Sequence, residues 1–151
     1  MAKEPIERCL PADLLQEATL RGNEYAWAAR DIPRVIEAAR AAGLVNLGGQ
    51  LQFRVPGGAT CEAYWVSVFP YRSVGDAAVR DTLVERSAIE TRELYDALSL
   101  EYDFAAEVRR GFAGVVDEFQ AGGNVPGDAI CFVWDVATCD ECDQIRDAPG
   151  P

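Results

Sequence analysis

Apolar side chains recur at helical spacing along four stretches of the chain, and this pattern predicts four helices. The four stretches are residues 11–21, 31–43, 76–100 and 103–119. A proline lies in the first turn of each of the first two, and a glycine stands at or just after the end of each. Gly111 and Gly114 weaken the middle of the last predicted helix, because glycine is a poor helix former.

The pattern changes to a period of two in the middle of the chain. Leu51, Phe53 and Val55 alternate with polar residues, and a run rich in aromatic and β-branched residues occupies positions 61–69. A Pro-Gly-Gly sequence between the two runs is typical of a turn. Together these features predict a β-hairpin over residues 48–69.

The register of this hairpin follows from separating polar from apolar side chains. A loop of three or five residues sets Arg54 opposite Glu62 and Gln52 opposite Tyr64, and it keeps the apolar residues of both strands on one face. A two-residue loop would mix polar and apolar residues across the two strands. We therefore predict a loop with an odd number of residues.

Residues 129–136 form a nearly continuous apolar run, which is typical of a strand that is covered on both faces. We expect this strand to pair with the hairpin inside the sheet. The predicted fold is α+β, with a small antiparallel sheet made of the 48–69 hairpin and the 129–136 strand and with helices packed on one face. Residues 1–151 form a single domain in this prediction, and roughly the last five residues fray.

Composition narrows the classes of function. The chain has 151 residues, an ordinary size for one domain, and a formal net charge of -11. Such a surface repels phosphate backbones and anionic lipids, so we expect no nucleic-acid partner and no membrane partner, and a basic protein partner is favoured instead. The chain lacks a run of roughly 18 apolar residues and a secretory pattern, so the prediction is a cytoplasmic protein.

Histidine is absent from the sequence. This excludes Ser-His-Asp and Cys-His nucleophilic catalysis, and it excludes metal sites that use imidazole ligands. Paired carboxylates are the remaining route to acid–base chemistry, but the sequence places no two of them at a defined separation. We expect no cofactor and favour a protein that is not an enzyme.

Five cysteines in a chain without an export signal indicate free thiols rather than a disulfide framework. Cys139 and Cys142 form a CxxC pair, but their acidic neighbours disfavour the thiolate form that redox chemistry needs. As zinc ligands the pair supplies two of the usual four, so a site would also need Cys131, nearby carboxylates or a second chain. We predict no metal site, and this pair is the candidate if one exists.

One set of polar residues is a candidate ligand site. Its members come from the hairpin and the long helix, and they are Gln50, Gln52, Arg54, Glu62, Tyr64 and Glu90. If they converge, Arg54 would hold an anionic group and Glu62 or Glu90 would act as acid or base. Glu90 could instead pair with Arg86 one turn earlier. The alternative for the whole set is the solvated outer face of the sheet, the commoner fate of such side chains.

Tyr25 and Trp27 are the candidate interface residues, because exposed Tyr and Trp side chains act as anchors in protein interfaces. Packing in the core is the alternative. Two functions remain. The first is a binding protein of the immunity or inhibitor type, which presents an acidic surface to a basic protein. The second is a ligand-binding or enzymatic pocket over the hairpin at Arg54.

Overall fold

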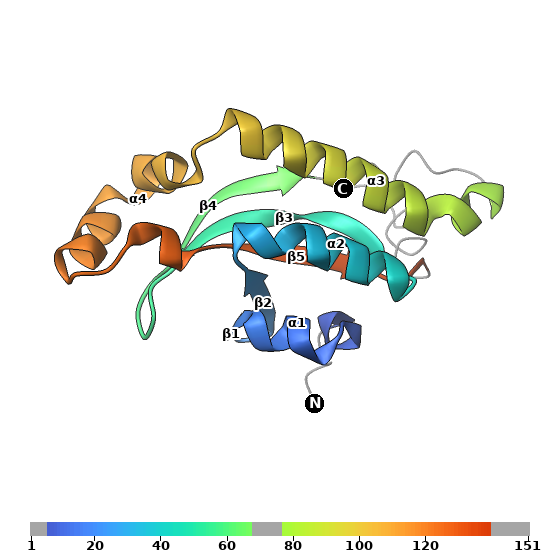
Figure 1. Cartoon of the computed structure of the whole chain (residues 1–151), viewed down its shortest axis with the longest axis horizontal. Helices are drawn as coiled ribbons and strands as arrows, with labels where there is room; N and C mark the ends of the chain where they lie inside the picture. The colour runs from blue at the N-terminus through green and yellow to red at the C-terminus, as the bar shows by residue number, and fades with distance from the viewer. Residues whose placement is uncertain (1–5, 68–76, 140–151) are drawn as a thin grey trace, which may run out of the picture.

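A five-stranded antiparallel sheet carries four α-helices on one face in the computed structural model, which describes residues 6–67 and 77–139 (Figure 1). The strands are β1 (Thr19–Arg21), β2 (Glu24–Trp27), β3 (Val45–Arg54), β4 (Thr60–Ser67) and β5 (Ile130–Ala137). The helices are α1 (Ala12–Glu17), α2 (Ile32–Ala41), α3 (Ala77–Glu101) and α4 (Phe104–Ala121). This arrangement confirms the predicted α+β class, with helices on one side of the sheet.

The strand order is β1-β2-β5-β3-β4, so β5 lies in the middle and pairs with β2 and β3. This confirms that the apolar run near the end of the chain is an interior strand. The predicted end of the hairpin at 68–69 and the predicted fraying of the last residues fall outside the described residues. Among the helices that the structure describes, none has the length and apolar character to cross a membrane.

Three of the four predicted helices are present. The stretches 31–43, 76–100 and 103–119 correspond to α2, α3 and α4. The backbone of α4 leaves helical geometry at Phe112, where φ is -137° and ψ is 40°. This kink lies between Gly111 and Gly114, the two residues that weaken the helix.

Only the first part of the predicted helix over residues 11–21 is a helix, and the prediction is wrong for the rest. Helix α1 ends at Glu17, and the next residues form β1, which pairs antiparallel with β2. The two-residue loop between these strands is Gly22-Asn23, and Gly22 has a φ of +59°, a conformation that glycine adopts at little cost. A Gly-Asn pair is a known hairpin signal, and here it outweighs the helical propensity of the residues before it.

The hairpin of β3 and β4 has an odd loop of five residues, as predicted, but its register is displaced. Arg54 lies opposite Thr60 and Gln52 lies opposite Glu62, so the predicted pairing of Arg54 with Glu62 is wrong. The displacement is two residues along β4, because the chain turns earlier than expected within residues 55–59. A shift by two positions keeps each side chain on its predicted face.

A bulge follows on the same strand pair. The register changes between Leu51 and Gln52, so that Tyr64 lies opposite Leu51 and not opposite Gln52 as predicted. The separation of faces still holds near the turn. Leu51, Phe53 and Cys61 are buried in the main core under the helices, whereas Gln52 lies on the other face of β3.

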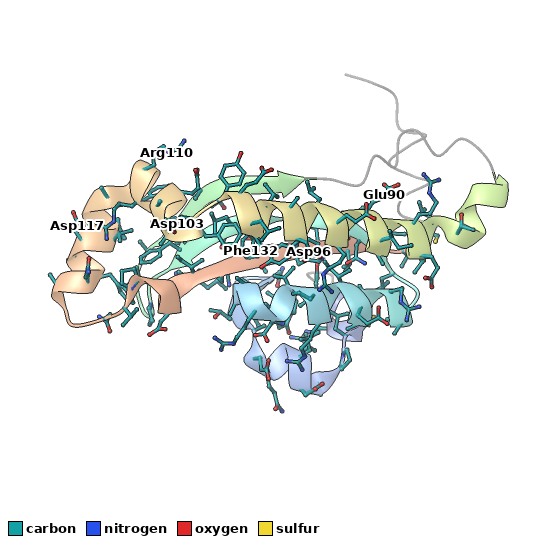
Figure 2. All side chains as sticks on the ribbon, turned by 45° about the horizontal axis from the view of Figure 1, so that its top comes forward. Glu90, Asp96, Asp103, Arg110, Asp117 and Phe132 are labelled. Atoms are coloured by element: carbon teal, nitrogen blue, oxygen red, sulfur yellow. The ribbon has the colours of Figure 1, made fainter. Side chains whose placement is uncertain are left out.

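Aromatic side chains fill the space between the sheet and the helices. Tyr95 of α3 meets the rings of Phe132 and Trp134 edge to face, with centroids 5.6 Å and 6.2 Å apart. Phe104 at the start of α4 packs on Phe132 in the same way at 4.9 Å, and Figure 2 places Phe132 beneath α3. These contacts join α3 and α4 to the central strand β5.

Asn46 of β3 ties four elements together inside this core. Its side chain is fully buried, donates to the carbonyl of Ile36 in α2 at 3.2 Å and accepts from the indole of Trp134 at 2.9 Å. Its backbone N–H donates to the hydroxyl of Ser87 in α3 at 3.0 Å. Every polar group at this junction therefore has a partner, which a buried polar side chain requires.

Candidate functional site

Three of the predicted site residues form a connected row on the face of β3 that points away from the helices. Arg54 Nε donates to Gln52 Oε1 at 2.9 Å, and Gln52 Nε2 donates to Gln50 Oε1 at 2.9 Å. Arg54 Nη1 also donates to the backbone carbonyls of Thr19 at 2.7 Å and Glu24 at 3.2 Å. The row therefore joins β3 to the β1–β2 hairpin.

The sheet curls around this row. Arg21 of β1 reaches across to the loop between β3 and β4. It donates to the carbonyls of Val55, Gly58 and Ala59 and to the hydroxyl of Thr60. As a result Arg54 is only 4% exposed and Gln52 is fully buried. Burial lowers the pKa of Arg54, but an arginine at this depth keeps its charge.

The other predicted members of the site are distributed differently. Glu62 is exposed on β4 directly opposite Gln52. Glu90 lies on α3, on the opposite side of the sheet, and pairs with Arg86 at 3.6 Å (Figure 2). Tyr64 is paired through its backbone with Leu51, and its side chain is outside the described part of the structure. The structure therefore brings Gln50, Gln52 and Arg54 together and leaves Glu90 apart.

This arrangement suits a structural role for Arg54. Three of its hydrogen bonds go to the protein itself, and two of those end on main-chain carbonyls that need a donor. A guanidinium used in this way links two hairpins and gives the curled sheet a polar interior.

Asp135, a half-buried acidic residue, lies further along the same face. The register pairs Ala26 with Val133, and Glu24 and Asp135 each lie two residues beyond this pair on adjacent strands. Burial, together with the negative charge of Glu24, raises the pKa of Asp135 to about 6. Asp135 is therefore an acid that titrates near neutrality in a protein without histidine.

Tyr25 and Trp27, the predicted interface residues, lie in the core. Tyr25 is 9% exposed and Trp27 is fully buried, and their rings stack with centroids 6.1 Å apart. The indole N–H of Trp27 donates to the carbonyl of Leu14 in α1 at 2.8 Å. The hydrogen bond of Trp27 therefore attaches α1 to β2.

The cysteines show no assembled metal site in the described part of the chain. Cys139 follows β5, and Cys142 lies outside the described residues. Within the described ranges no three Cys, Asp or Glu side chains gather in a way that could hold a metal ion. Cys61 and Cys131 are buried, and burial raises the pKa of Cys131 to about 11 although Arg54 opposes the shift. Cys131 is therefore a protonated thiol and not a nucleophile.

The solvent side of α3 is a surface that the sequence pattern did not indicate. Its inner side buries Leu83, Ala88, Tyr95 and Leu98. Apolar residues also occur on the outer side, and they are Ile89 (57% exposed) and Leu100 (89%), whereas Leu94 (36%) lies at the flank of the buried side. The two faces could have been distinguished in the sequence, because Ile89 and Leu100 fall off the stripe that points inward.

Acidic side chains surround these apolar residues. Glu90 and Asp96 pair with arginines on α3 itself, whereas Glu93 and Glu101 have no ion pair within the described residues. Figure 2 shows Glu90, Asp96 and Asp103 along the run from α3 into α4. We define the α3 outer face as Ile89, Glu93, Leu100 and Glu101, with the half-exposed Leu94 at its flank.

Comparison with known proteins identifies no relative: no family model, no curated protein and no solved structure matches the chain. The α3 outer face is therefore interpreted from its own chemistry.

Proposed function

We propose that this protein is a non-enzymatic binding protein that takes a basic protein partner on the α3 outer face. The observation that carries the proposal is that a long helix, already packed on the sheet, leaves Ile89 and Leu100 exposed on its other side and Leu94 half-exposed at its flank. A surface helix that needs no partner is normally polar on its solvent side. Exposed apolar residues gathered on one element are typical of an interaction site.

The geometry of the α3 outer face suits a partner with two apolar recesses. Ile89 and Leu100 are eleven residues apart, which on a helix corresponds to about 16 Å along the axis. Burying a fully exposed Ile or Leu side chain stabilises a complex by about 1.5–3 kcal/mol. Two such anchors on a preformed helix resemble the helix-in-groove mode of recognition.

Charge supports a basic partner rather than a second copy of this chain. The protein carries a formal net charge of -11, so two identical acidic faces would repel each other. Glu93 and Glu101 leave their charges uncompensated within the described residues, beside the apolar anchors. Lysine or arginine side chains on a partner would pair with them and steer the encounter. Action in the cytoplasm is part of the proposal, because a reducing compartment keeps thiols such as Cys61 and Cys131 unoxidised.

The test is site-specific photo-crosslinking in the cells that produce the protein. A photo-reactive amino acid in place of Leu100 or Ile89 is expected to capture the same basic protein, whereas one in place of the exposed Gln16 on α1 captures nothing in common with them. Capture from Gln16 of that same protein, or capture of an acidic protein from α3, would contradict the proposal.

A matched pair of double variants tests the charge argument. Glu93→Gln with Glu101→Gln removes two charges from the α3 outer face, and Glu118→Gln with Asp128→Asn removes two exposed charges elsewhere. The first pair is expected to lower crosslinking from Leu100 at least tenfold, and the second is expected to leave it within about twofold. Equal effects of the two pairs would mean that net charge alone, and not this face, attracts the partner.

A further inference from the structure

A cleft lies on the exposed side of α2, next to α1, and is separate from the α3 outer face. Its volume is about 420 Å³, which is within the range of pockets for small ligands. The apolar part of its lining comes from α1 and the connection before it (Pro11, Leu14) and from α2 (Pro33, Ala38, Ala41). The small residues of α2 leave the space that larger side chains would fill.

Arg92 of α3 stands where this cleft meets a second one. The second cleft has a volume of about 310 Å³ and lies between α2 and α3. The two share Pro33, Glu37 and Arg92 as lining residues, so they adjoin at the start of α2. A ligand in the first cleft would therefore have the guanidinium of Arg92 at one end.

The other charged groups at this junction are engaged with one another. Arg34 donates to Glu17 at 2.8 Å and lies 3.4 Å from Asp13 and from Asp31. Arg40 holds Glu37 through Nε and Nη2, so the carboxylate of Glu37 is already paired with a cation. The acidic side chains that line the first cleft, Asp13 and Glu37, thus each have an arginine partner. Asp13 shares Arg34 with Glu17 and Asp31, and Glu37 shares Arg40 with Glu85.

Arg92 differs from them in its unused donors. Its Nε donates to both oxygens of Asp96, at 3.0 Å and 3.1 Å, which holds the side chain in place. Within the described residues no hydrogen bond occupies its Nη1 and Nη2 groups, which carry four N–H donors. A guanidinium presented in this way matches the two oxygens of a carboxylate.

We propose that this cleft binds a small carboxylate with an apolar body. The carboxylate accepts hydrogen bonds from the Nη groups of Arg92, and the apolar body lies between α1 and α2 against Leu14, Ala38 and Ala41. The first cleft shares no residue with the α3 outer face, although Ile89 lines the second cleft together with Arg92. Because the type of ligand also differs, the site adds to the proposed function and does not depend on it.

The experiment titrates the full chain with three probes that share one ring and differ in charge. These are indole-3-propionate, neutral 3-methylindole and cationic tryptamine, followed by two-dimensional NMR of the backbone amides. Indole-3-propionate is expected to shift amides of α1 and α2 around Leu14 and Ala41, and to bind at least tenfold more tightly than tryptamine. Absence of shifts in α1 and α2 at millimolar concentration, or tryptamine binding as tightly, would overturn the proposal.

Variants assign the roles within the site. Arg92→Gln is expected to weaken the binding of indole-3-propionate at least tenfold and to leave the binding of 3-methylindole unchanged. Ala41→Trp fills the cleft, so it is expected to abolish the binding of both probes. Arg109→Gln on α4 is the matched control, because Arg109 is 43% exposed, close to the 49% of Arg92, and also pairs with an aspartate on its own helix. An Arg92→Gln protein that folds and binds indole-3-propionate as the Arg109→Gln protein does would disprove the anchoring role.

Discussion

Among single residues, Arg54 shows how a buried charged side chain can hold parts of the fold together. Its side chain is 4% exposed, and no carboxylate pairs with it within the described residues. Its donors go instead to Gln52 and to the carbonyls of Thr19 and Glu24. Hydrogen bonds to a charged donor contribute more than neutral ones, and removing the donor leaves buried carbonyls unsatisfied.

Arg54→Met therefore tests this role, because methionine keeps much of the apolar stem and removes the donors. We expect the free energy of unfolding to fall by about 2–4 kcal/mol, measured by urea denaturation. The control is Arg110→Met, since Arg110 is 75% exposed in its pair with Glu107 and its loss should cost less than about 1 kcal/mol. Equal losses in the two variants would show that the contacts of Arg54 add little to stability.

Asp135 is a single residue that makes the stability of the protein depend on pH. The native state raises its pKa to about 6 by burial and by proximity to Glu24, whereas an unfolded aspartate titrates near 3.9. The native state therefore binds the proton more tightly than the unfolded chain. The contribution of Asp135 to stability is fully present below about pH 4 and is lost as the pH rises through about 6.

Asp135→Asn is expected to remove this loss, because a neutral amide has no charge to desolvate. Between pH 4 and pH 7, the free energy of unfolding of the variant should rise by about 2 kcal/mol relative to that of the natural protein. Urea denaturation at a series of pH values measures it. Glu24→Gln should shift the midpoint of the effect to lower pH, since it removes the second cause of the raised pKa. A difference that is constant with pH would contradict this assignment.

At the scale of elements, α4 shows a helix that is weakened by its own sequence. A Cβ atom added at Gly114 would meet no heavy atom within 4 Å, and the residue is not in the left-handed region. The nearby kink at Phe112 is then a consequence of poor helix formers and not of a collision that requires glycine. Gly49 in β3 is the opposite case, because its Cβ would lie 2.5 Å from the carbonyl oxygen of Val133.

Gly114→Ala is therefore expected to stabilise the protein by about 0.5–1 kcal/mol, because alanine loses less backbone entropy in a helix. Gly49→Ala should destabilise it, since β3 and β5 would have to move apart at the centre of the sheet. Thermal unfolding of the two variants measures both changes in stability, the expected gain for Gly114→Ala and the expected loss for Gly49→Ala. A loss of stability in Gly114→Ala would mean that the helix needs its glycine for a reason other than space.

At the scale of the whole molecule, the two faces of the sheet are closed by different means. The helices cover one face with an aromatic core, and the curl of the sheet toward the β1–β2 hairpin buries the polar row on the other. The described surface then leaves large apolar residues mainly on α3 and just after it: Ile89, Leu94, Leu100 and Tyr102, with Leu20 and Val125 elsewhere. The contacts that stabilise the fold and the proposed binding surface thus lie in different parts of the molecule.

This separation predicts that binding can be lost without loss of the fold. Ile89→Ser together with Leu100→Ser should change the free energy of unfolding by less than about 1 kcal/mol, because exposed side chains contribute little to the native state. The same double variant should abolish crosslinking of the basic partner, read from a photo-reactive residue at Leu94. A variant that unfolds, or one that still captures the partner, would contradict the division between the two faces.

Local patterns in the amino-acid sequence were enough to place several of the helices and strands. The spacing of apolar residues placed α2, α3 and α4, and the continuous apolar run placed β5 inside the sheet, because these patterns reflect burial of one face or of both. The strand β1 was not determined in this way. Its three residues are strand only because the Gly22-Asn23 turn brings them beside β2.

Which polar residues come into contact depends on how the strands and helices pack in three dimensions. The sequence grouped Arg54 with Gln50 and Gln52 correctly, since they alternate on one strand, but it could not show that Glu90 lies on the opposite side of the sheet. Nor could it show that the carbonyls of Thr19 and Glu24 occupy the donors of Arg54. The physical reason is that alternation tells which side chains share a face, whereas the curl of the sheet and the packing of helices decide what covers that face.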